Sequence, residues 1–489
     1  MVDADTLATP VGFLPETSFG VPLHGTDTNN LTLPGGYDIF MPNVYTAKLV
    51  EGMRIKIGVN FYTVLTYTSI DPTHCKLTLD NPIVAGIPAG TPVLFCFIPF
   101  QHRLKTWEPE EDVNRDVWGG VGSGLIADRS TQAGRTANIS WDGVKGRDIH
   151  KICAPSGPRY NLMSSMLAHL FTDDGELDYV DGDGNISIRA SSNAPTVTFL
   201  WGIKTGEYRI ATGCVFTSSE EDWPEGMDGL EGIKGEISSQ KIDVIDDAML
   251  AMFWLSPTPE PYRGPLMRAH GCTKIRFQHK TSFREPLLAG GSIVKVVNSR
   301  GFDNGDSIIL VNELGFTESF SISLVNHTTR EITLNIPTIR SYSDFTSWVQ
   351  GVTKKSYRLK EFNLKNKSGQ ALFGDVSKPY DYRTGALADK LEIESSFSMR
   401  RDSFTPFYAH KGDASGTRLI IEIIEYEAPD QVGNAAAFYR LMEFAFTGNI
   451  KEPLTDEGKE VDDEFSMKLV RDRVHPNLIM QVINDAPPA

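Results

Sequence analysis

Alternation of apolar and polar residues is the main structural signal in this chain. The run RASSNAPTVTFLWGI at 189–203 and the run TRLIIEIIEY at 417–426 carry β-branched and aromatic residues at alternating positions, bounded by Ser, Asn and Pro. A period of two is typical of β-strands. In the second run it places Ile420, Glu422 and Ile424 on one face. Both segments are predicted to be long strands, and the fold class is predicted to be mainly β.

Few segments have helical spacing. PRYNLMSSMLAHLF at 158–171 places Leu162, Met166 and Leu170 on one side of a helix, which would pack on a sheet. NAAAFYRLMEFAF at 434–446 is ambiguous, because Ala and Leu favour helix while its YRL motif matches a predicted strand elsewhere in the chain. We predict a strand for its second half.

The chain matches itself at several places in the same order. A fixed order of matches is the signature of internal repetition. The matched pairs are TSFGVPL at 17–23 with TSFREPL at 281–287, EGMRIKI at 51–57 with NGDSIIL at 304–310, IDPTHCKLTLDNP at 70–82 with VNHTTREITLNIP at 325–337, GLIAD at 124–128 with GALAD at 385–389, YRIATGCVFT at 208–217 with YRLMEFAFT at 439–447, and EGIKGEIS at 231–238 with KEVDDEFS at 459–466.

These matches predict a tandem duplication of one β core. The first copy is expected at 1–245 and the second at 281–489, with a connector at 246–280. Within each copy, short strands separated by Gly, Asn, Asp and Pro turns predict a small barrel-like β lobe, at about 45–100 and about 292–349. A length of 489 residues agrees with several domains, at about 100 to 200 residues each.

Composition narrows the class of protein. The chain is 40% hydrophobic and 22% charged, which indicates a globular protein. Its longest apolar runs, at 92–100 and 248–255, are far shorter than the ~20 residues of a membrane span. The N-terminus has neither a basic nor an apolar region of a secretory signal, so we expect synthesis and assembly in a cytoplasm.

The negative net charge of the chain argues against binding to nucleic acid. The chain has 63 acidic and 47 basic residues, and a formal net charge of −16. Proteins that bind nucleic acid through its phosphates need the opposite balance. Two acidic stretches, SSEEDWPEGMDGLEG at 218–232 and GNIKEPLTDEGKE at 448–460, occupy corresponding positions in the two copies. We interpret them as solvated, turn-rich loops, with a surface that repels polyanions as the functional alternative.

The cysteines form no pattern of a disulfide framework or a zinc site. There are five, without a CxxC pair: Cys75, Cys96, Cys153, Cys214 and Cys272. We expect reduced, mostly buried side chains. Disulfides between subunits remain the alternative.

Catalytic and cofactor motifs are missing from the sequence. The glycines of VWGGVGSGLIAD at 117–128 match neither dinucleotide nor phosphate-loop spacing, and neither GxSxG nor HExxH occurs. The histidines, such as His102 and His410, are isolated. Asp181, Asp183 and Asn185 imitate the start of a calcium loop, but its required Gly and Glu positions hold Ile186 and Ser192. We therefore predict no catalytic, cofactor-binding or metal-binding residues.

The C-terminal run LMEFAFTGNIKEPLTDEGKEVDDEFSMKLV at 441–470 consists of a predicted strand, an acidic extended loop and a returning strand. It resembles the end of tail tube proteins of long-tailed bacteriophages. The resemblance extends to the second core, and to the first through the internal repeat. It implies a β-sandwich or barrel core, stacked rings, and a channel through which the genome leaves the virion.

Tube subunits of this family mostly have one core per chain and six chains per ring. A duplicated chain would close the same ring as a homotrimer with pseudo-sixfold symmetry, because closure depends on the rotation per core. The expected partners are further copies of the chain and other tail proteins, such as sheath, baseplate or terminator. The genome would pass through the lumen without specific binding, and no membrane would be involved.

Three other functions stay open at this stage. Another tail component, such as a sheath, hub or terminator protein, would have similar β structure. A non-catalytic β-domain binding protein is a second class. A glycan-cleaving enzyme with two carboxylates is a third, although acidic pairs such as Asp173 and Asp174 are too common here to indicate one.

Overall fold

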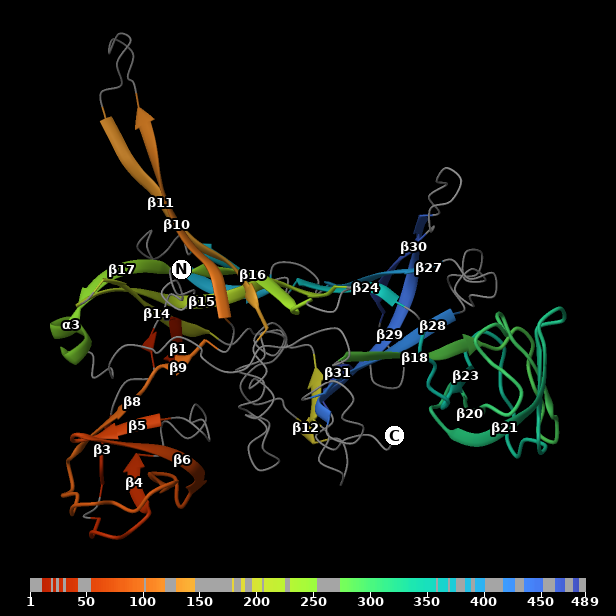
Figure 1. The fold of residues 1–489 in the computed structure, drawn as a ribbon, viewed down its shortest axis with the longest axis horizontal. Helices are drawn as coiled ribbons and strands as arrows, with labels where there is room; N and C mark the ends of the chain where they lie inside the picture. Colours follow the sequence, from red (N-terminus) through yellow and green to blue (C-terminus); the bar gives the residue numbers. More distant parts are fainter. Residues whose placement is uncertain are drawn as a thin grey trace.

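The computed structural model is built almost entirely from β-strands (Figure 1). It describes residues 11–18, 21–22, 26–29, 32–42, 54–100, 103–118, 129–145, 178–179, 186–189, 196–204, 206–224, 229–252, 273–357, 359–367, 370–374, 383–387, 392–400, 417–426, 435–451, 462–470 and 478–482. Within these ranges the one helix is α3 (Asp247–Met252). The mainly β fold predicted from the alternation is confirmed.

The first half contains an antiparallel network that turns around one long strand, β15 (Glu207–Trp223). The N-terminal part of β15 pairs with β14 and β17, and β14 pairs with β1. Its C-terminal part pairs with β16, which is followed in the sheet by β11 and β10. The bounds are β1 Val11–Ser18, β10 Arg103–Trp118, β11 Arg129–Val144, β14 Val197–Lys204, β16 Gly232–Ser239 and β17 Lys241–Asp246.

The second half repeats this pairing order around β29 (Ala435–Lys451). One part of β29 pairs with β28 and β31, and β28 pairs with β18. The other part pairs with β30, followed by β27 and β24. The bounds are β18 Thr273–Ser282, β24 Leu359–Lys367, β27 Glu392–Arg400, β28 Thr417–Tyr426, β30 Asp462–Leu469 and β31 Leu478–Val482.

Each half carries a small β lobe. In the first lobe the pairing order β4–β7–β6–β5–β8 is extended by β3; in the second lobe it is β19–β22–β21–β20–β23. The bounds are β3 Thr26–Asp27, β4 Asp38–Pro42, β5 Arg54–Ile57, β6 Asn60–Ser69, β7 His74–Leu79, β8 Pro92–Phe95, β19 Ile293–Lys295, β20 Ser307–Val311, β21 Thr317–Asn326, β22 Glu331–Leu334 and β23 Trp348–Gly351. In Figure 1 the lobes lie at the left and right of the central strands.

Irregularities of the ladders recur at corresponding places. The β6–β7 ladder shifts register between Val64 and Thr66, and the β21–β22 ladder shifts between Ile322 and Leu324. The β10–β11 ladder shifts after Leu104, and the β24–β27 ladder shifts after Leu359. Bulges bend a strand and fix its register, so they are features of a particular fold rather than accidents.

The two halves join edge to edge. The C-terminal end of β15 pairs with β24, from Ser218 opposite Lys367 to Trp223 opposite Phe362. The order β10–β11–β16–β15–β24–β27–β30–β29 is therefore one continuous antiparallel sheet. A second link pairs β13 (Ile186–Arg189) with β31. The other short strands are β2 Val21–Pro22, β9 Ile98–Pro99, β12 Asp178–Tyr179, β25 Gln370–Gly374 and β26 Arg383–Leu387.

One face of the continuous sheet is apolar. A single buried cluster contains Trp141 and Phe216 of the first half together with Phe397 and Phe465 of the second. The rings of Trp223 and Phe362 lie 5.4 Å apart across the junction. On the first half this face packs against β1 and β14. There the rings of Phe199 and Phe216 lie edge to face, with 5.8 Å between their centroids. The alternation seen in the sequence thus separates a core side from an opposite, polar side.

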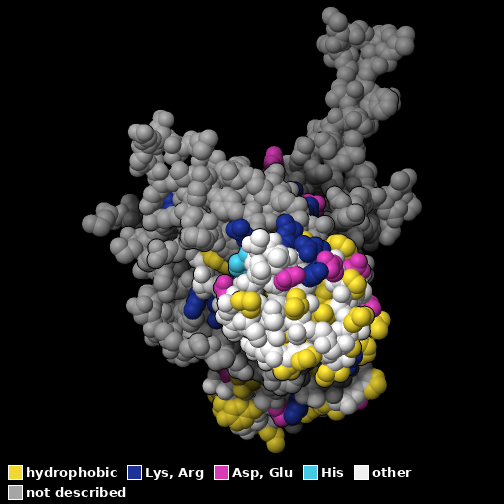
Figure 2. Space-filling view, turned by 90° about the vertical axis from the view of Figure 1, so that its right-hand side faces the viewer, with side chains coloured by type: hydrophobic (Ala, Val, Ile, Leu, Met, Phe, Trp, Pro, Cys, Tyr) yellow, Lys and Arg dark blue, Asp and Glu magenta, His cyan; other side chains and the backbone are white. Residues whose placement is uncertain are grey.

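Hydrophobic side chains are also exposed on the lobes. Figure 2 shows such residues scattered between polar groups over the face of the second lobe. They include Leu288, Leu314 and Ile339, each more than 70% exposed. Val59 and Val84 are similarly exposed on the first lobe.

Several elements predicted from the sequence can be compared directly with the structure. The strand predicted at 417–426 is β28, and of the strand predicted at 189–203 the part from Val197 onward is found as β14. The ambiguous run 434–446 is strand from Ala435 onward. The helix expected at 158–171 lies outside the described residues. Within the ranges that are described, no helix has the length and hydropathy needed to cross a membrane.

Candidate functional site: the polar face of the continuous sheet

The side of the continuous sheet opposite the core is covered by polar residues from both halves. Ladder register places these residues on one face, because side chains alternate between the two sides of a strand. From β10 to β30 they are Thr106, Glu108, Glu110, Asn138, Ser140, Asp142, Lys234, Glu236, Ser238, Ser218, Glu220, Asp222, Asn363, Lys365, Lys367, Glu361, Ser398, Ser396, Glu394, Glu392, Glu464, Ser466 and Lys468. We call this surface the polar face.

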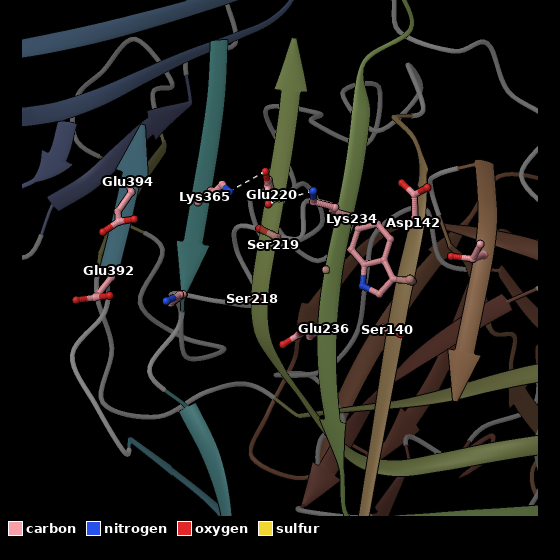
Figure 3. Close-up of a pocket in the computed structure, with 14 residues that line it drawn as sticks. Ser140, Asp142, Ser218, Ser219, Glu220, Lys234, Glu236, Lys365, Glu392 and Glu394 are labelled. Atoms are coloured by element: carbon pink, nitrogen blue, oxygen red, sulfur yellow. Dashed lines mark ion pairs between the residues drawn. The ribbon is translucent and has the colours of Figure 1, made fainter. Parts of the chain in front are cut away.

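The polar face is predominantly acidic. Its lysines are Lys234, Lys365, Lys367 and Lys468, and they are outnumbered by its aspartates and glutamates. A hollow of about 540 Å³ lies on this face. Residues of β10, β11, β16, β15, β24 and β27 line it, among them Asp142, Glu220, Glu236, Lys365 and Glu394. Figure 3 shows these side chains projecting from neighbouring strands.

A row of charges crosses the junction between the halves. Glu220 of β15 lies 3.3 Å from the Lys234 ammonium of β16 and 3.1 Å from the Lys365 ammonium of β24 (Figure 3). The Asn363 side-chain amide also donates a hydrogen bond of 2.8 Å to Glu220. Partial burial opposes ionisation of Glu220, but these donors and positive charges outweigh it and lower the pKa of the carboxyl group.

Asp222 lies two residues beyond Glu220 on β15, opposite Gly232 and Asn363. Its carboxylate accepts a hydrogen bond from Asn363. Partial burial and the neighbouring negative charge of Glu220 nevertheless raise the pKa of Asp222 above its ordinary value. The two carboxylates therefore differ in how firmly they hold their charge, although they lie two residues apart on one strand.

At the far end of the hollow, Lys468 of β30 bridges two glutamates of β27. Its ammonium lies 2.6 Å from Glu392 and 3.5 Å from Glu394. The hydrogen bond with Glu392 raises the pKa of Lys468, and the charges of both glutamates add to this effect. Lys234, Lys365 and Lys468 are thus each paired with carboxylates, and the carboxylates of the polar face outnumber its lysines, which leaves a surplus of negative charge.

The acidic stretch 218–232 was expected to be a solvated loop, and this is wrong for its described part. Ser218–Trp223 is the end of β15, paired on both sides. Glu221 points to the core side, where its carboxylate lies 2.9 Å from the buried Lys145 ammonium. Glu231, also buried, is 3.7 Å from Lys145 and accepts a hydrogen bond of 2.6 Å from Thr273 of β18. Pairing of charges makes this burial tolerable.

The other residues considered in the sequence are partly described by the structure and partly outside it. Cys75 and Cys214 are buried and Cys96 is half-buried, whereas Cys153 and Cys272 lie outside the described residues. So do the glycine loop at 119–128, the calcium-like residues Asp181 to Asn185, and the part of the second acidic stretch after Lys451. Among described residues, no group of three or more His, Cys, Asp or Glu side chains is arranged to hold a metal ion.

The polar face itself was not anticipated from the sequence. Its strands are distant along the chain, and a local pattern does not reveal which strands become neighbours. The available signal was the alternation of charged residues in β24 and β27, as in Asn363–Lys365–Lys367 and Glu392–Glu394. In comparisons with known proteins, no protein-family model matches the chain, and no curated protein matches its sequence.

Proposed function

We propose that the protein is a structural virion protein, a subunit of a bacteriophage tail tube that forms stacked rings around a DNA-conducting channel. The observation that carries this proposal is the β15–β24 pairing, which joins two halves of the same strand order into one sheet with a polar and an apolar face. A sheet of this kind becomes a channel wall when the same edge-to-edge step is repeated around a ring.

The matching halves support a duplicated core. Both have the same order of paired strands, the same placement of the lobe, and bulges at corresponding positions. If the step from the first to the second core repeats between chains, a ring of six cores closes with three chains. The protein is then a homotrimer with pseudo-sixfold symmetry, located in the tail of the virion.

The negative charge of the polar face supports its placement along a channel for DNA. A surface of ion pairs with excess carboxylates repels phosphate within a Debye length of about 8 to 10 Å. It offers none of the unpaired lysine and arginine clusters by which proteins bind the nucleic-acid backbone. We assign this face to the channel lumen, where passing DNA must not adhere.

The chemistry of the hollow favours this structural role over catalysis. A glycosidase requires an acidic group whose pKa is raised, in addition to a second carboxylate. Glu220, at the centre of the lining, has a lowered pKa and is ion-paired on both sides, and Asp222, whose pKa is raised, is not one of the residues that line the hollow. The proposed partners are therefore other copies of the chain and other tail proteins such as sheath, baseplate or terminator.

Negative-stain electron microscopy of the purified protein across a concentration series tests the proposal. Rings or tubes with an open lumen and six core densities around it are the expected result. Monomers or dimers at every concentration, also after addition of tail-tip proteins that start assembly, would contradict it and favour another tail component or a non-catalytic binding protein.

A further inference from the structure

Two strand edges of the continuous sheet correspond to the edges that meet inside the chain. Within the chain, the end of β15 pairs with β24. In the repeated order of strands, the end of β29 takes the position of the end of β15, and β10 takes the position of β24. Among the described strands, β10 pairs only with β11, and no strand pairs with the other edge of β29 beyond Phe446. Pro109 in β10 agrees with an edge position, since proline is confined to edges and bulges of sheets.

The ladder registers define which residues correspond. Glu220 lies opposite Lys234, and Lys451 lies opposite Glu464. Lys234 is in turn opposite Asp142, and Glu464 is opposite Ser398. Following the same bulge in β10 and β24, Thr106 corresponds to Glu361, so that Glu110 corresponds to Lys365. If the junction repeats between chains, Lys451 of one chain lies opposite Glu110 of the next.

The charges at these positions are inverted between the two junctions. Inside the chain the row reads Lys234, Glu220, Lys365, with both ion pairs formed. The corresponding row between chains reads Glu464, Lys451, Glu110. Glu110 and its neighbour on the same face, Glu108, are exposed and form no ion pair with any residue that the structure describes.

We propose that β10 of each chain binds the end of β29 of a second copy of this chain in this register, with Lys451 against Glu110, and that the charge inversion dictates which edges may meet. This inference rests on the proposed ring and names its interface. Directly opposed residues of opposite charge stabilise a strand pair, whereas like charges destabilise it.

The inversion acts against the wrong pairings. Placing β10 beside β15 would oppose Glu110 and Glu220, and placing β29 beside β24 would oppose Lys451 and Lys365. Two copies of the same strand in this register would likewise oppose Glu110 to Glu110 or Lys451 to Lys451. Among contacts between a strand end, β15 or β29, and an outer strand, β24 or β10, only β15 with β24 and β29 with β10 put opposite charges face to face. Repulsion of alternatives is a common source of specificity.

Cysteine substitution tests the pairing and its register. The single variants Glu110→Cys and Lys451→Cys are mixed under mild oxidation and separated on a non-reducing gel. Opposed Cβ atoms of about 4.5 to 5.5 Å place the thiols within reach of a disulfide. The mixture is expected to give a covalent dimer that neither single variant gives alone, and the double variant is expected to give a ladder of higher species.

Controls separate the register from non-specific oxidation. The unsubstituted protein measures the background of native thiols. The pair Glu220→Cys with Lys365→Cys should close within one chain, without a change in chain number. The pair Glu108→Cys with Lys451→Cys is two residues out of register and should crosslink much less. A dimer formed equally by Glu110→Cys alone would overturn the head-to-tail pairing.

Charge reversal tests the inversion. Glu110→Lys and Lys451→Glu are each expected to raise the protein concentration needed for assembly by at least about tenfold, and the double variant is expected to recover it. Failure of the double variant to recover, while both singles fold with unchanged thermal midpoints, would contradict the charge rule. Rings without the crosslink would overturn this interface but leave the proposed tube intact; neither rings nor crosslinks would overturn both.

Discussion

Glu220 of β15 and Lys365 of β24 lie directly opposite one another across the junction of the two halves, with their charged groups 3.1 Å apart. Glu220 belongs to β15, which also pairs with β14 and β17, and Lys365 belongs to β24, the outermost strand of the sheet in the other half. The two halves of the chain are therefore joined by strand pairing with an ion pair across the junction. The same arrangement in reverse charge is the basis of the proposed contact between chains.

The buried Lys145 is expected to hold the core side of the junction together. Its side chain is 3% exposed and lies between Glu221 and Glu231. Lys145→Met removes the cation and leaves two buried carboxylates without it, which should destabilise the fold by about 3 to 5 kcal/mol. Thermal unfolding followed by circular dichroism measures the change. Lys234→Met, at a side chain that is 51% exposed, serves as control and should cost less than about 1 kcal/mol.

Asp222→Asn is expected to stabilise the protein at neutral pH. Because the folded-state pKa of Asp222 is raised, the fold favours its protonated form, and this contribution is lost as pH rises through that pKa. Asparagine stays neutral at every pH and keeps an acceptor for Asn363. The gain in thermal midpoint should be absent near pH 3 and present at pH 7, corresponding to less than about 1 kcal/mol. A lower midpoint of the variant at pH 7 would refute the assignment.

Gly235 is expected to tolerate no side chain. It lies opposite Trp141 in the β11–β16 ladder, and a Cβ atom there would approach the indole ring to 2.8 Å and the Ser218 carbonyl oxygen to 2.6 Å. Gly235→Ala should therefore cost about 1 to 3 kcal/mol through overpacking. On the same strand, a Cβ at Gly232 would meet ordinary contacts of 3.6 Å, so Gly232→Ala is the matched control. Equal midpoints for the two variants would count against this packing.

Reversing charge on the polar face is expected to create affinity for DNA. The variant Asp142→Lys with Glu236→Lys adds two cations beside Lys234 and Lys365 in the hollow. Fluorescence anisotropy with a labelled duplex should show binding that weakens with salt, while the unsubstituted protein shows none. The same reversals at Glu331 and Asp344 of the second lobe form the control. DNA binding by the unsubstituted protein at physiological salt would argue against a repellent lumen.

The fold class could be predicted because strand periodicity is local. Alternating β-branched and aromatic residues indicate β14 and β28, and the order of the repeated motifs along the chain predicts two similar halves. The duplication itself stays a prediction. Register was harder: the match of EGIKGEIS with KEVDDEFS aligns Ile237 with Phe465, whereas the ladders place Ile237 opposite Phe216 and Met467 opposite Phe446. A slip of two residues preserves the face, so the pattern alone does not detect it.

The polar face and the buried charges could not be derived from local sequence. Glu220 and Glu221 are adjacent, yet one faces the hollow and the other a buried lysine, because the strand end at 218–223 acquires partners on both sides from distant segments. A run of acidic residues normally indicates a solvated loop. Here long-range pairing converts it into a strand, and neither Lys145 nor Lys365 is close enough in the chain to reveal that.

Cryo-electron microscopy of the assembled protein would resolve which face of the continuous sheet lines the channel. We expect a ring of three chains in which the polar face, including Glu220, Asp142 and Glu394, lines an open channel, with β10 of each chain beside β29 of the next. A ring whose channel is lined by the lobes or by the core side of the sheet, or an assembly in which another protein or a second sheet covers the polar face, would contradict it.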